Sequence, residues 1–77
     1  MPRFFIHHVE ANLRIEDEEG AVFADLAEAR REAKCAALEM MADHLRGGSE
    51  VGERVLEIWD ESGQHLGSVL MRDLSPL

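Results

Sequence analysis

Hydrophobic residues repeat with a helical period in one segment of the chain. From Leu26 to about Leu45 there is no glycine, proline or β-branched residue, and Gly47-Gly48 follows as a stop signal. Asp25 can cap the N-terminus, and Glu28 three residues later completes a capping box. The pattern therefore predicts one helix, whose small alanine side chains would let it lie close to a sheet. Its apolar stripe consists of Leu26, Ala29, Ala33, Ala36, Ala37, Met40 and Met41, with His44 at the C-terminal end.

Four other segments show the composition or the alternation of β-strands. Residues 3–9 are rich in aromatic and β-branched side chains, and residues 13–16 alternate apolar with charged positions. Residues 53–60 and 64–71 are predicted to form a hairpin about Ser62-Gly63. Between the second strand and the helix, an acidic turn at 17–20 precedes a short extended piece at 21–23.

This order predicts an α+β fold with the sequence β-β-α-β-β. We expect a small, mostly antiparallel sheet of four strands with one helix packed on one face, all within a single domain over residues 1–77. The position of the third strand relative to the first stays open, because the connection through the helix allows either neighbouring or distant placement.

A two-residue turn in the hairpin would pair Asp60 with His65, Ile58 with Gly67 and Leu56 with Val69. Side chains alternate between the faces of a strand, so this register divides the apolar residues into two sets. One set comprises Leu56, Ile58, Gly67, Val69 and Met71. The other comprises Val55, Trp59, Leu66 and Leu70, together with Phe5 and Val9 of the first strand. A single helix covers only one of these faces. The second is covered either by the N-terminal turn and residues 74–77 or by another subunit.

Size and charge narrow the possible functions. A chain of 77 residues has a thin core, and its single cysteine, Cys35, excludes an internal disulfide, so self-association is the expected stabiliser. The lone thiol and the lack of an apolar run after Met1 predict a cytoplasmic protein, and no stretch is long enough for a membrane helix. With 8 basic and 16 acidic residues, the formal net charge of −8 argues against nucleic acid as the partner.

No residue pattern points to catalysis, a cofactor or a metal. His7 and His8 are adjacent on a strand and point to opposite faces, so they cannot chelate one ion together. His44 and His65 are assigned structural or surface positions, and Cys35 lies opposite the apolar stripe of the helix as a surface thiol. We therefore expect a protein that is not an enzyme, with no catalytic residue, cofactor or metal site.

Five short motifs in order carry a resemblance that covers nearly the whole chain. They are Pro2-Arg3-Phe4-Phe5 with His7, Asp17-Glu18-Glu19-Gly20, Asp25-Leu26-Ala27-Glu28-Ala29-Arg30, Asp60-Glu61-Ser62-Gly63 and Met71-Arg72-Asp73. On these, the chain resembles a family of short, uncharacterised proteobacterial proteins catalogued as a domain of unknown function. Family members more often have an aromatic residue in place of Ile6 and phenylalanine in place of Met71. The resemblance implies no activity, cofactor or site residue.

The function that fits these observations is a non-enzymatic protein-interaction module that forms a homodimer. Its interface is predicted on the second sheet face, at Phe5, Val55, Trp59, Leu66 and Leu70, or along an exposed strand edge. The alternative is an acidic regulatory protein that binds a basic partner protein. The order of elements in this chain and its acidic turn are also similar to those of the antitoxin half of a bacterial toxin–antitoxin pair.

Overall fold

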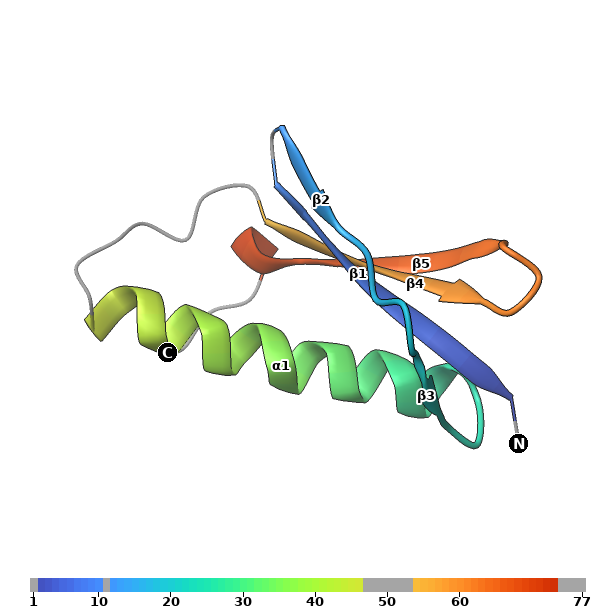
Figure 1. Cartoon of the computed structure of the whole chain (residues 1–77). Coiled ribbons are helices and arrows are strands. Elements are labelled where there is room, and N and C mark those ends of the chain that lie inside the picture. Colours follow the sequence, from blue (N-terminus) through green and yellow to red (C-terminus); the bar gives the residue numbers. More distant parts are fainter. Residues whose placement is uncertain (1, 11, 47–53, 74–77) are drawn as a thin grey trace.

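The computed structural model describes residues 2–10, 12–46 and 54–73, with the side chains of 44–46 and 73 excepted (Figure 1). Its α+β architecture is the predicted one, with a single helix lying along one side of a sheet. The elements are β1 (Arg3–Glu10), β2 (Leu13–Ile15), β3 (Ala21–Val22), α1 (Leu26–Arg46), β4 (Val55–Asp60), β5 (His65–Leu70) and a short 3-10 helix, η1 (Met71–Asp73).

The N-terminal strand, β1, lies in the interior of the sheet. The order is β2-β1-β4-β5, every pair is antiparallel, and β3 pairs with the N-terminal end of β1 on the same edge as β2. The strand order that the sequence left open is thus resolved, because β4 lies directly beside β1. Phe5 is opposite Trp59 and Ile6 is opposite Ile58 in this register.

Helix α1 begins at the predicted cap. The Asp25 carboxylate accepts a hydrogen bond from the Glu28 backbone N–H at 2.9 Å, and the Glu28 carboxylate accepts one from the Ala24 N–H at 3.2 Å. Three alanines of the predicted stripe are completely buried against the sheet, so the helix backbone lies close to the strands. The core consists of Phe4, Ala29, Ala33, Ala37, Met41, Leu56, Ile58, Val69 and Met71.

The β4–β5 hairpin differs from the prediction at its turn. The Gly63 N–H donates to the Asp60 carbonyl at 3.1 Å, and Gly63 adopts a φ of 85°, so the loop contains a third residue in the left-handed region. The extra residue shifts the register, and His65 lies opposite Trp59 instead of Asp60. The predicted Asp60–His65 pair is therefore wrong, whereas the pairs of Ile58 with Gly67 and of Leu56 with Val69 are confirmed.

Asp17 joins the two short strands that share one edge of β1. Its carboxylate accepts hydrogen bonds from the N–H groups of Ile6, at 3.2 Å, and Gly20, at 3.0 Å, while its own N–H donates to His7 Nδ1 at 2.9 Å. Gly20 adopts a φ of 68° at this turn. A β-carbon added there would lie only 2.7 Å from the Phe4 carbonyl oxygen, so the turn requires glycine for both conformation and space.

Candidate functional site

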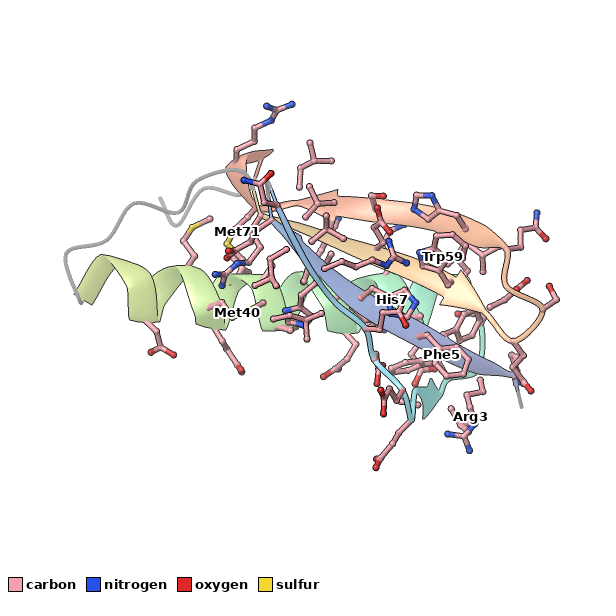
Figure 2. All side chains as sticks on the ribbon, turned by 45° about the horizontal axis from the view of Figure 1, so that its top comes forward. Arg3, Phe5, His7, Met40, Trp59 and Met71 are labelled. Carbon is pink, nitrogen blue, oxygen red and sulfur yellow. The ribbon has the colours of Figure 1, made fainter. Side chains whose placement is uncertain are left out.

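The sheet face turned away from α1 carries a continuous group of rings (Figure 2). The rings of Phe5 and His7 have their centroids 6.5 Å apart, and those of His7 and Trp59 are 5.9 Å apart. Trp59 stacks on His65 with a centroid distance of 5.0 Å and an interplanar angle of 14°. These four residues come from β1, β4 and β5, so the ring group crosses the centre of the sheet and ends at its β5 edge.

Polar groups fix the orientation of the Trp59 indole. Its Nε1–H donates to Glu57 Oε1 at 3.1 Å, and the Arg14 guanidinium carbon lies 5.4 Å from the ring centroid, within cation–π range. Arg14 also donates to Glu57 at 3.0 Å. Burial acts to raise the pKa of Glu57, but the hydrogen bonds from Trp59 and Arg14, aided by the positive charge of Arg14, outweigh it and hold the pKa below its ordinary value.

Apolar side chains occupy the other end of this face. Val55 pairs with Leu70 on β5 and with Val9 on β1, and all three are half-buried. Arg54, Val55, Leu70 and Arg72 line a shallow pocket of about 230 Å³ beside them. Phe5, Val55, Trp59 and Leu70, four of the five residues predicted for the interface, therefore share one face.

Leu66 is the exception. It packs against the buried core instead of joining the face turned away from α1. The cause is the register shift between Ile58 and Trp59: these residues pair with Gly67 and His65, so Leu66 is an extra residue without a partner on β4. His65 takes the predicted place of Leu66 beside Trp59.

Sequence reasoning missed the polar half of this site. Arg14 and Glu57 meet only because β2, β1 and β4 are neighbours in the sheet, and their residue numbers carry no sign of it. A two-residue loop predicts that His65 pairs with Asp60 and not with Trp59. The signal available was Asp60-Glu61-Ser62-Gly63, in which glycine at the fourth position favours a type I turn followed by a bulge.

Among the described residues, three of the four exposed large apolar side chains lie outside this face, and the fourth, Val22, is opposite Arg3 on the same side of the sheet as Phe5. Leu13 and Ile15 on β2 are 54% and 57% exposed, followed by Val22 on β3 and Leu38 on α1. Cys35 is exposed on the helix, as predicted. Within the described residues, no group of three or more His, Cys, Asp or Glu side chains converges as a metal site. No helix in the described part of the chain has both the length and the apolar character needed to cross a bilayer.

A comparison with protein families gives one match. The family model described as "Domain of unknown function (DUF6894)" matches residues 3–72. The chain belongs to this family. Its motif-based resemblance to a domain of unknown function is confirmed at that level, and the family's description names no activity. Neither the search of curated proteins nor the search of solved structures found a significant match.

Proposed function

We propose that this member of the family is a non-enzymatic protein-interaction module that forms a homodimer through the sheet face that α1 leaves uncovered. The observation that carries the proposal is the set of four large apolar side chains, Phe5, Val55, Trp59 and Leu70, on a face opposite the core. A lone exposed thiol, Cys35, fits a reducing cytoplasm as the place where such a dimer would form.

The polar groups on this face favour docking because they are already paired. The indole N–H of Trp59 and the guanidinium of Arg14 both donate to Glu57, and His7 accepts the N–H of Asp17. His65 Nε2 lies within hydrogen-bonding distance of the hydroxyl of Ser68, at 2.9 Å. Removing water from the face would therefore leave few polar atoms without a partner, which lowers the cost of burial.

A second copy of the chain is the partner that this face fits. Trp59 is already held in one orientation by its stacking on His65 and its hydrogen bond to Glu57, so little side-chain entropy would be lost on binding. The face also carries a cation, Arg14, next to an anion, Glu57, so a two-fold axis would bring together surfaces that are balanced in charge. Tryptophan at the centre of such a patch typically carries much of the binding energy.

Light scattering after size exclusion tests the dimer directly. We expect a mass near twice 8.7 kDa that persists at high salt, since the contact is mainly apolar. Trp59→Asp should weaken the dimer by roughly thirtyfold or more, as expected for loss of a central interface residue. Leu38→Asp is the control, because Leu38 is 41% exposed on the helix, away from this face.

Circular dichroism should show that each variant keeps its helix. If Trp59→Asp does not fold, Leu70→Lys provides a second test on the same face, since Leu70 is only half-buried. A wild-type mass of 8.7 kDa at all working concentrations would refute the homodimer. A dimer that survives both Trp59→Asp and Leu70→Lys would place the interface elsewhere and refute the assignment of this face.

A further inference from the structure

Helix α1 covers only part of the sheet side on which it lies. Neighbouring strands are about 4.8 Å apart and a helix is roughly 10 Å wide, so one helix spans about two strands. The buried side chains under α1 come largely from β4 and β5, namely Leu56, Ile58 and Val69. On the same side of the sheet, Leu13 and Ile15 of β2 remain exposed, and Figure 1 shows β2 rising away from the helix. Within the described residues, the sheet surface at β2 thus lies beyond α1.

A groove marks this position between α1 and β2. It encloses about 300 Å³, and its apolar lining includes Ile6, Ile15 and Ala36. A smaller pocket of about 90 Å³ extends it, and Leu13 lies in its wall. Ile15 and His8 line both spaces, so the two lie next to each other.

The rim of the groove is acidic. Glu16, Asp17 and Glu32 line it from the strand side and the helix side. Arg14 pairs with Glu16 at 3.3 Å, so the acidic charge that a ligand would meet comes mainly from Asp17 and Glu32. Arg54 is paired with Glu10, and burial lowers the pKa of His8, as does the positive charge of Arg54, against the opposing effect of Asp17.

We propose that this groove binds a basic amphipathic helix from a partner protein. Apolar residues of the helix would cover Ile15 and Leu13, and its lysine or arginine side chains would lie against Glu32 and Asp17. A second copy that presents the same groove does not fit here, because the acidic rims of the two grooves would repel one another. The groove lies on the opposite side of the sheet from the proposed dimer face, so this inference does not depend on the homodimer.

A synthetic helix-forming peptide with leucine on one face and lysine on the other serves as the probe. NMR titration of the ¹⁵N-labelled protein should shift the amides of β2 and of α1 around Ala36 first, leaving those around Trp59 unchanged. Ile15→Ser should weaken binding roughly tenfold by removing the apolar contact, and Glu32→Lys should weaken it by a similar factor. Both side chains are exposed or at the surface, so the fold should persist.

Two matched variants separate this site from general attraction between opposite charges. Leu38→Ser removes an exposed leucine from another face of α1, and Glu61→Lys makes the same charge change at the distant hairpin turn. Both should bind the peptide within about twofold of the wild type. The proposal is overturned if the peptide does not bind, if shifts spread over the acidic surface, or if Leu38→Ser and Ile15→Ser have equal effects.

Discussion

The turn at Gly20 provides a sharp test of the fold. In Gly20→Ala, an alanine would have to adopt the left-handed conformation, which costs roughly 1–2 kcal/mol. Its β-carbon would lie 2.7 Å from the Phe4 carbonyl oxygen and 2.8 Å from Phe5 Cε2. Because the first of these atoms is backbone, the turn must move away from β1, and overpacking of this kind costs about 1–3 kcal/mol. The expected loss of stability is therefore about 2–5 kcal/mol, a large part of the total for so small a domain.

Gly63→Ala is the matched control for this prediction. Gly63 has a similar positive φ of 85°, but a β-carbon there would meet no atom within 4 Å. The control should lose only the conformational part, about 1–2 kcal/mol. Urea denaturation followed by circular dichroism measures both losses. Equal destabilisation of the two variants would refute the claim that close packing of Gly20 against β1 holds this turn in place.

Three further variants and one NMR titration test the core and two titrating groups. Met71→Ala should reduce the free energy of unfolding by about 2–5 kcal/mol, because Met71 is completely buried, and the half-buried Met40→Ala should lose less; thermal unfolding distinguishes them. Hydrogen bonds from the Gln64 and Ser62 groups of the turn lower the pKa of Asp60 in the folded protein. The ionised carboxylate should therefore contribute its full stabilisation above about pH 4, and this contribution should disappear as the pH falls through the pKa of the folded state. In denaturation curves measured over this pH range, Asp60→Asn should lack the part of the acid-induced loss of stability that is due to Asp60. Burial, followed by the charge of Arg54, lowers the pKa of His8, so NMR should show its ring titrating below about pH 6.5. Because protonation of His8 is harder in the folded than in the unfolded state, the free energy of unfolding should fall as the pH drops through that region.

The helix and the core-facing side chains of the hairpin could be predicted because their signals are local. Asp25 and Glu28 specify the cap within one turn, and the spacing of alanines such as Ala29 and Ala33 specifies the buried stripe. Likewise, the alternation around Ile58 predicts which side chains enter the core. In each case the residues concerned are close together in the sequence or recur at a regular spacing, so the pattern can be recognised in a single sequence.

The remaining features depend on contacts between distant segments. Placing β4 beside β1 brings Glu57 next to Arg14, and nothing in either segment specifies that pairing. The alternation of residues 13–16 predicts a half-exposed strand, yet the apolar Leu13 and Ile15 are exposed as well, because alternation indicates only which side of the sheet a residue faces. It does not indicate whether the helix reaches that far. The three-residue turn that ends at Gly63 and the register shift after it bring Leu66 against the core, an outcome that alternation alone cannot anticipate.

The central position of β1 has a consequence for synthesis of the protein. Among the strands of this sheet, β1 leaves the ribosome first, yet its longest partner, β4, is separated from it by the whole helix, with Phe4 opposite Asp60. Closing so long a loop is entropically costly, and domains that depend on distant pairings fold slowly. Until β4 has been translated, the inner edge of β1 has no neighbour and α1 has little apolar surface to pack on. The nascent chain therefore completes its sheet late, and during that interval it relies on its strong negative charge to resist aggregation.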